Sequence, residues 1–349
     1  MFAELQLPLA LNLAIFVGIA GVVWFAGARL TLYADIISDR TGISKALLGF
    51  IFLATVTQLP EVVTNTTGAI RGSGQLVVNS MFGGIAMQTA VLALADVVAR
   101  GQALTFYTYR SGTHLQGVIL ILALALLLGA SELGDLLLGW QVGLAPVLMA
   151  GLYALAIFLI WRYEGNRQWE PIHTPDEVKA ERTRELQETH QDTSLAGLQR
   201  RSIMAGFVIL LGGVALVDLA ETIAVQSGFG SSFIGVTLLA SATSLPELST
   251  VIAAVRLGSH DMAVSDIFGS NLIMVFLLLP TDLFYREGPL LSAIDSSARL
   301  ALVLGIVLTS VYLVGLYMRS RRRVLGMGLD SILVLVLYGS ALFAFYQLR

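Results

Sequence analysis

The chain has no cysteine among its 349 residues, and charged residues make up only 13% of it. The lack of cysteine excludes disulfides, thiol nucleophiles and thiolate metal sites. Soluble domains carry about 25% charged residues, so the scarcity of charge excludes an ordinary soluble domain. A net charge of −3 gives no reason to expect a nucleic-acid partner. Hydrophobic residues make up 56% of the chain and fall in runs of about 20 or more, the length of a membrane span.

Apolar runs separated by charged or turn-rich breaks predict ten membrane spans. The first run has no Lys or Arg before it and is too long for the apolar part of a signal peptide, so we expect it to remain as a span. A polar segment, 163–200, follows the fifth span and is expected to be a partly helical loop in water. The expected spans are 7–33, 44–70, 75–98, 115–136, 141–162, 202–226, 232–256, 260–283, 297–318 and 326–347.

Lys and Arg residues are distributed unevenly between the predicted loops. With the N-terminus outside the cell, the loops after odd-numbered spans hold 16 of the 21 Lys and Arg residues, or 17 with Arg256. Short cytoplasmic loops carry an excess of these residues. The distribution therefore predicts an external N-terminus and a cytoplasmic 163–200 loop.

The chain contains an internal repeat. A shift of 186 positions aligns residues 27–96 with 213–282 without a gap, and 20 of the 70 pairs are identical. Because five spans, an odd number, separate each element from its copy, the two halves are expected to face opposite ways. Inverted repeats with broken helices at the midplane are typical of secondary transporters. We therefore predict an all-α polytopic membrane protein of two inverted five-helix repeats, 1–162 and 201–349, joined by the polar loop.

A Pro-Glu pair interrupts an apolar run once in each half, at Pro60-Glu61 and at Pro246-Glu247. Proline lacks an N–H and its ring clashes with the preceding turn, so kinks with free backbone oxygens are expected in the second and seventh spans. A carboxylate at bilayer depth is costly to insert, and intramembrane carboxylates usually mark function. One such pair could be a structural kink with a protonated carboxyl, but two at matched positions favour a functional site.

The residues around the two kinks are rich in oxygen. Carboxylate, hydroxyl and carbonyl oxygens are the ligands that hard cations such as Ca²⁺ prefer. If the halves meet, Glu61, Glu247 and Asp266 converge, and cations or a proton must neutralise part of their charge. The candidate metal ligands are Thr57, Gln58, Glu61, Ser80, Thr243, Ser244, Glu247 and Asp266.

Two segments carry a resemblance to a known family: Thr-Ser-Leu-Pro-Glu at 243–247 and Ser-Asp-Ile-Phe-Gly-Ser-Asn at 265–271. They resemble the second α-repeat of the calcium/cation antiporter superfamily, and are most similar to its prokaryotic sodium/calcium exchanger branch. The resemblance implies exchange of Ca²⁺ against Na⁺ or H⁺ in a prokaryotic inner membrane. It also implies that Glu61, Glu247 and Asp266 bind the ion, assisted by hydroxyls of the kinks.

The first repeat departs from the family pattern. Gln58 stands where the family usually has Ser, and Ser80 where it usually has Asn. Gly83-Gly84-Ile85 replaces the Gly-Ser-Asn that the second repeat keeps at 269–271. Fewer hydroxyl ligands leave the divalent site in place and leave both Na⁺ and H⁺ open as the counter-ion.

The leading prediction is therefore a secondary antiporter that exchanges a divalent cation, Ca²⁺, against Na⁺ by alternating access. An H⁺-coupled exchanger is the main alternative, and a cation channel or an intramembrane hydrolase fits the oxygen-lined midplane site less well. We expect no enzyme activity and no cofactor, and the expected partners are inorganic cations and the lipid bilayer. Asp96 and Asp282 are expected to cap helix ends, and Gly83, Gly84 and Gly269 to allow close helix packing.

Overall fold

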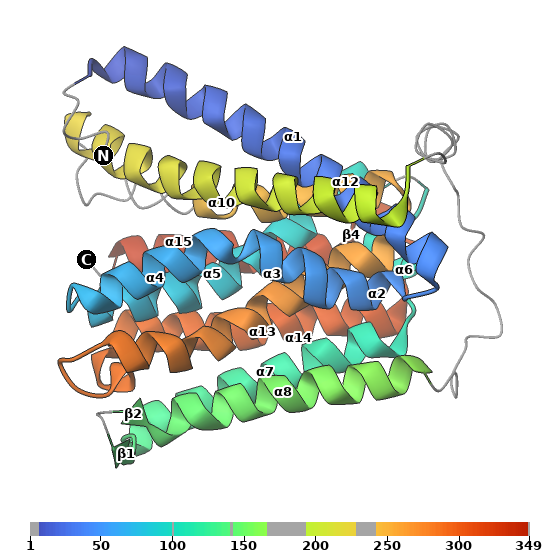
Figure 1. The fold of residues 1–349 in the computed structure, drawn as a ribbon. Helices are drawn as coiled ribbons and strands as arrows, with labels where there is room; N and C mark the ends of the chain where they lie inside the picture. Colours follow the sequence, from blue (N-terminus) through green and yellow to red (C-terminus); the bar gives the residue numbers. More distant parts are fainter. Residues whose placement is uncertain (1–6, 100, 140–141, 166–192, 228–241, 348–349) are drawn as a thin grey trace.

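The computed structural model describes residues 7–99, 101–139, 142–165, 193–227 and 242–347, and its long helices run side by side along one common direction (Figure 1). The helices are α1 (Leu9–Thr41), α2 (Lys45–Leu47), the π-helix η2 (Leu48–Leu53), α3 (Ala54–Thr57), α4 (Leu59–Ile70), α5 (Gly74–Ala95), the 3₁₀-helix η3 (Asp96–Val98), α6 (Leu104–Tyr107), α7 (Ser111–Leu133), α8 (Leu144–Gly165), α10 (Leu195–Gln226), α12 (Leu245–Arg256), α13 (His260–Phe284), the 3₁₀-helix η4 (Leu290–Ala293), α14 (Ser296–Met318) and α15 (Leu329–Gln347).

The described helices follow the ten predicted spans. Seven of them are each long and apolar enough to cross a membrane, or eight when the bent pair Lys45–Thr57 and Leu59–Ile70 counts as one span. The tenth span is the shorter α15, and α12 forms the second part of the seventh span. The first part of the seventh span, and most of the 163–200 loop, lie outside the described residues. The prediction of an all-α polytopic membrane protein is confirmed.

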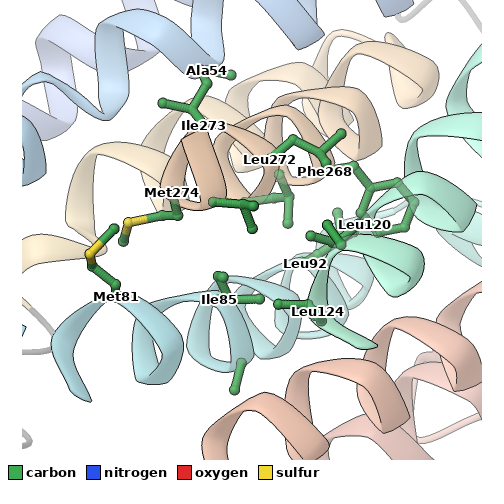
Figure 2. Packing of buried hydrophobic residues seen from close by; sticks show 14 of the residues in the cluster. Ala54, Met81, Ile85, Leu92, Leu120, Leu124, Phe268, Leu272, Ile273 and Met274 are labelled. Carbon is green, nitrogen blue, oxygen red and sulfur yellow. The ribbon is translucent and has the colours of Figure 1, made fainter. Parts of the chain in front are cut away.

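Helix α13 lies at the centre of the bundle, where it packs against η2, α5, α7, α8 and α12. In an apolar stretch of 18 residues within α13, 89% of the residues are buried. In the corresponding stretch of α1 only 17% are buried. Figure 2 shows the packing on one side of α13, where apolar side chains of α13 face those of α5 and α7. The labelled residues there are Phe268, Leu272 and Met274 of α13, Met81, Ile85 and Leu92 of α5, and Leu120 and Leu124 of α7, whereas Ile273 points toward Ala54 on the other side of α13.

Glycine allows close contacts between helices in this core. A Cβ atom on Gly269 would lie only 2.5 Å from the carbonyl oxygen of Phe50 in η2, so only glycine fits. A Cβ on Gly84 would meet the Met274 methyl at 2.8 Å. Close packing is thus confirmed at Gly84 and Gly269. The same expectation is wrong for Gly83, where a Cβ would have no atom within 4 Å.

Helices α1 and α10 form an outer pair, side by side and running in opposite directions (Figure 1). At one end of the pair, Asn12 Nδ2 donates to Gln226 Oε1 at 2.8 Å. Each helix also reaches the opposite half through a glycine. A Cβ on Gly27 would clash with the Ser249 hydroxyl, and a Cβ on the repeat-equivalent Gly213 would clash with the Pro60 ring.

Helix α1 continues to Thr41, eight residues beyond the predicted end of the first span. The prediction ended the span where polar residues begin, but the polar residues near Thr41 have partners inside the protein. Asp35 is fully buried, and Lys45 Nζ lies 2.7 Å from its Oδ1. The Ser259 hydroxyl also donates to Asp35 and accepts a 3.1 Å hydrogen bond from Lys45. A paired carboxylate can be buried, so the helix extends past the apolar run.

Two short antiparallel hairpins were not predicted. Strands β1 (Leu137–Gly139) and β2 (Val142–Gly143) join α7 to α8, and β3 (Arg323–Val324) and β4 (Met327–Gly328) join α14 to α15. Strands this short carry no recognisable alternation of apolar and polar residues. They are confined to loops, so the all-α fold class stands.

Loops that follow odd-numbered spans meet at one end of the bundle, as the ten-span layout requires. The Arg319 guanidinium donates to the Phe106 carbonyl at 3.0 Å, and Arg323 donates to the Gly101 carbonyl at 3.1 Å. On the same end, the Arg110 N–H donates to Asp261 Oδ1 at 3.2 Å. These contacts gather basic residues of different loops on one face of the membrane protein.

Candidate cation-binding site

The second span is broken at its middle, where the Pro-Glu pair predicts a kink. Helix α3 ends at Thr57, Gln58 has φ −80° and ψ −4°, and α4 begins at Leu59 with Pro60 in its first turn. The two parts of the span are bent by 47°. Proline is well tolerated in the first turn of a helix, because an N–H there has no helical partner. The predicted kink is therefore confirmed in the second span.

The same local structure recurs in the second half. Ser244, with φ −87° and ψ 1°, precedes α12, which begins at Leu245 with Pro246 in its first turn. The backbone angles of Ser244 match those of Gln58 to within a few degrees. Each half thus presents a helix that starts inside the bundle, directly before its glutamate.

Three carboxylates lie in the interior of the bundle. Glu61 and Glu247 belong to the first turns of α4 and α12, and Asp266 lies two turns into the buried α13. All three are buried, with 4% of Glu61 and none of the other two exposed. Glu61 and Asp266 are both near enough to Glu247 for their charges to act on it. In the described part of the chain, however, no three His, Cys, Asp or Glu side chains are close enough to hold one metal ion by themselves.

Hydrogen bonds join the two broken helices and α13 around these acids. Gln58 Nε2 donates to Glu247 Oε1 at 2.9 Å, across the two repeats. The hydroxyls of Thr57 and Ser270 lie 3.4 Å apart, which connects the first break to α13. Predicted site residues from both halves are therefore in direct contact.

Thr250 belongs to the site and was not predicted. Its hydroxyl lies 2.6 Å from Asp266 Oδ2 and 3.0 Å from the Glu247 carbonyl oxygen, so it joins two of the three acids. The repeat contained a signal for it, because Thr64 is the equivalent residue. The Thr64 hydroxyl donates to the Glu61 carbonyl at 3.2 Å in the same way.

Four buried oxygen atoms of the site have no hydrogen-bond partner in the described part of the chain. They are Gln58 Oε1, Glu61 Oε2, Glu247 Oε2 and Asp266 Oδ1. All four are acceptors, and a buried acceptor without a donor is costly. A positively charged guest removes that cost, and hard oxygen donors suit Ca²⁺, Na⁺ or a proton. These four oxygen atoms therefore fit a cation that enters the site as a substrate.

The other predicted ligands differ in their placement. Ser244 is buried and Thr243 half-buried, both beside the second break. Ser80 is exposed on α5, so the structure does not bring it into the buried cluster. Its neighbours Met81 and Ile85 face α13 (Figure 2), and successive helical residues point about 100° apart, which turns Ser80 away from the core. Repeat alignment placed Ser80 level with Asp266 but could not place it on the same face.

A broken second span, a matching Pro-Glu helix start in the other half and buried acceptor oxygens beside both are typical of secondary transporters with inverted repeats. The family model described as "Sodium/calcium exchanger protein" matches residues 11–162 and 201–347, and the chain belongs to this family of cation antiporters. It is a multi-pass transport protein of the prokaryotic calcium/cation antiporter branch and not an enzyme. The resemblance seen in the two repeat motifs is confirmed.

Individual relatives span most of the chain. It is 29% identical over 269 residues to "Inner membrane protein YrbG" of Escherichia coli (strain K12), which covers 76% of this chain and 77% of that protein. It is 25% identical over 308 residues to "Putative antiporter CaxA" of Alkalimonas amylolytica, covering 87% and 91%. The solved structure of the sodium-calcium exchanger NCX_Mj shares the fold, with a TM-score of 0.71, 19% identity and coverage of 97% and 99%.

Proposed function

We propose that the chain exchanges Ca²⁺ against Na⁺ by alternating access, at a site formed by Glu61, Glu247 and Asp266. The observation that carries the proposal is the set of four buried, unpaired acceptor oxygens between the two broken helices. A relative of Methanosarcina acetivorans named "Sodium/calcium exchanger MaX1" is 34% identical over 84 residues. The matched NCX_Mj structure was obtained with Na⁺ and Sr²⁺, a divalent ion of the Ca²⁺ group.

The three carboxylates balance the positive charge of whichever cation occupies the site. Because three negative charges share one buried region, an ion-free site is strongly disfavoured, and one cation species must replace the other. Gln58 holds Glu247 in place between exchanges and Thr250 holds Asp266, while Thr57 connects the first break to Ser270 of α13.

Access is proposed to alternate as the outer pair, α1 and α10, moves against the core. Small residues at the contacts, Gly27 and Gly213, bring the pair close to the two breaks. We place the site in a prokaryotic inner membrane, with the N-terminus outside and the 163–200 loop in the cytoplasm, as the distribution of Lys and Arg predicts.

Exchange against H⁺ is the second candidate. It is favoured by the first break, where Gln58 occupies the position of the hydroxyl residue Ser244 of the second break. A buried carboxyl can take a proton with no further ligand, whereas Na⁺ needs several oxygens.

The test is uptake of radioactive Ca²⁺ into proteoliposomes that hold the full chain, under an imposed Na⁺ or H⁺ gradient. Uptake driven by the Na⁺ gradient supports the proposal, and uptake driven only by the H⁺ gradient selects the second candidate. Uptake that neither gradient changes overturns both. Glu61→Gln and Glu247→Gln keep side-chain size and remove charge, so each is expected to reduce exchange at least tenfold. Wild-type exchange in both variants would remove these glutamates from the site.

A further inference from the structure

The two halves of the site differ at one position in the breaks. Gln58 and Ser244 are equivalent residues, each directly before a Pro-Glu helix. The fully buried Gln58 donates its amide N–H to Glu247 Oε1 of the opposite half. The second carboxylate oxygen, Oε2, has no hydrogen-bond partner among the described residues in either Glu61 or Glu247. One glutamate of the symmetric pair thus has a donor from the other repeat.

The amide of Gln58 is only half used. Its Nε2 is bonded to Glu247, while its Oε1 is buried without a partner. An amide carries donors at one end and an acceptor at the other, so a half-turn exchanges the two. In the present orientation the amide satisfies a carboxylate, and in the turned orientation its oxygen would be a cation ligand beside Glu247.

The bond to Glu247 is also charge-assisted, because its acceptor is a carboxylate when no cation or proton is bound. The neutral amide of Gln58 therefore stabilises the negative charge of Glu247 in part, as a bound positive ion would. Ser244 has a shorter side chain with a single rotatable O–H, so the equivalent position of the second half offers no comparable reach.

We propose that Gln58 lowers the number of counter-ions exchanged for each divalent cation, because its amide N–H replaces one monovalent ion or proton at Glu247. When the divalent cation binds, the amide turns and Oε1 becomes a ligand. When the divalent cation leaves, the N–H returns to Glu247. This inference rests on the proposed antiport and names a residue that sets its coupling ratio.

The experiment measures the coupling ratio in proteoliposomes that hold the full chain. Ca²⁺ is allowed to reach equilibrium against a series of Na⁺ or H⁺ gradients at a clamped membrane potential. The logarithm of the Ca²⁺ concentration ratio across the membrane is plotted against the logarithm of the counter-ion ratio. The slope of this plot is the coupling ratio. Gln58→Ser copies the residue of the second break, and Gln58→Met keeps the length of the side chain without donor or acceptor. Gln199→Ser, at an exposed position of α10, is the matched control.

Both Gln58 variants are expected to raise the coupling ratio by one counter-ion. They are also expected to raise the Ca²⁺ concentration at half-maximal exchange about tenfold. Gln199→Ser is expected to keep the wild-type values of both. A ratio that stays at the wild-type value in either well-folded variant overturns the inference, because a merely structural bridge would change stability and not the ratio. A wild-type chain that responds to neither gradient overturns the proposed function instead. Ca²⁺-dependent thermal stabilisation of each variant shows that the site is folded.

Discussion

Asp96 and Asp282, which are equivalent residues of the two repeats, make the same contacts at opposite ends of the bundle. Asp96 accepts hydrogen bonds from the N–H groups of Leu104 and Gly328, both at 2.6 Å. Asp282 accepts from Leu290 at 2.6 Å and from Gly143 at 2.8 Å. Both side chains are fully buried.

Each of these aspartates thus ties the end of one long helix to the next short helix and to a hairpin glycine. The predicted capping role near helix ends is confirmed, but the partners are distant backbone groups and not the helix's own end. The symmetry of these contacts indicates that the repeat preserves the connections between helix ends and loops as well as the candidate cation site.

Asp96→Asn and Asp282→Asn are each expected to lower the free energy of unfolding by about 1–3 kcal/mol, because the amide puts a donor against a buried N–H group. The two effects should add, since the sites lie far apart. Thermal unfolding in detergent measures them. Glu132→Gln, which breaks the exposed 2.9 Å pair with Arg299, is the control and should cost less than about 1 kcal/mol. Equal effects in all three variants would contradict the predicted role.

Thr250→Val removes the hydroxyl that joins Asp266 to the Glu247 carbonyl and leaves the volume nearly unchanged. We expect apparent Ca²⁺ affinity to fall about tenfold, because a net hydrogen bond to a charged group contributes about 1.5–3 kcal/mol. Thr64→Val is the matched control, since the Thr64 hydroxyl donates to the backbone carbonyl of Glu61. Ca²⁺ titration of exchange rates compares them, and equal losses in both variants would show a general packing effect.

Lys45→Met removes the ammonium group that lies 2.7 Å from the buried Asp35 carboxylate. We expect a loss of about 1–3 kcal/mol, less than the roughly 3–5 kcal/mol for a fully buried pair, because Lys45 is partly exposed. Adding Asp35→Asn should restore part of the stability, because the buried negative charge is then gone. A double variant that is less stable than Lys45→Met alone would contradict this account. Thermal unfolding of the single and double variants provides the cycle.

Gly269→Ala places a Cβ 2.5 Å from the Phe50 carbonyl, so it should push η2 away from α13 and reduce both stability and exchange. Gly83→Ala, at the equivalent position of the first repeat, has open space and is expected to be tolerated. It should even stabilise its helix by up to about 1 kcal/mol, because alanine favours helices over glycine. Expression level and thermal stability of the two variants distinguish them, and the opposite order would refute the contact.

Features that depend on the bilayer or on single residues could be predicted from the sequence. Apolar runs long enough to cross a membrane gave the helices, Pro60 gave the break in the second span, and the repeat gave the opposite orientation of the halves. Glu61, Glu247 and Asp266 stood out because charge is costly at that depth.

Features that depend on how helices face one another could not be predicted. The bond from Gln58 to Glu247 joins residues 189 positions apart, and no spacing rule encodes that contact. Ser80 aligned with Asp266 in the repeat, yet the rotation of α5 turns it outward. Thr250 was overlooked because a threonine three residues after a glutamate is common in helices that bind nothing.

The uneven burial of α1 would let the outer pair, α1 and α10, tilt about its packed end. Most residues of α1 after Gly27 are buried, whereas half of those from Leu9 to Ala26 are exposed, so a tilt of the helix would pivot near this glycine. The free arm, from Leu9 to Gly27, is about 27 Å long at 1.5 Å per residue, so a tilt of about 10° would move its tip by about 5 Å. The bond between Asn12 and Gln226 makes α10 share that displacement. A small rotation near Gly27 would therefore displace the far ends of both outer helices by several ångströms.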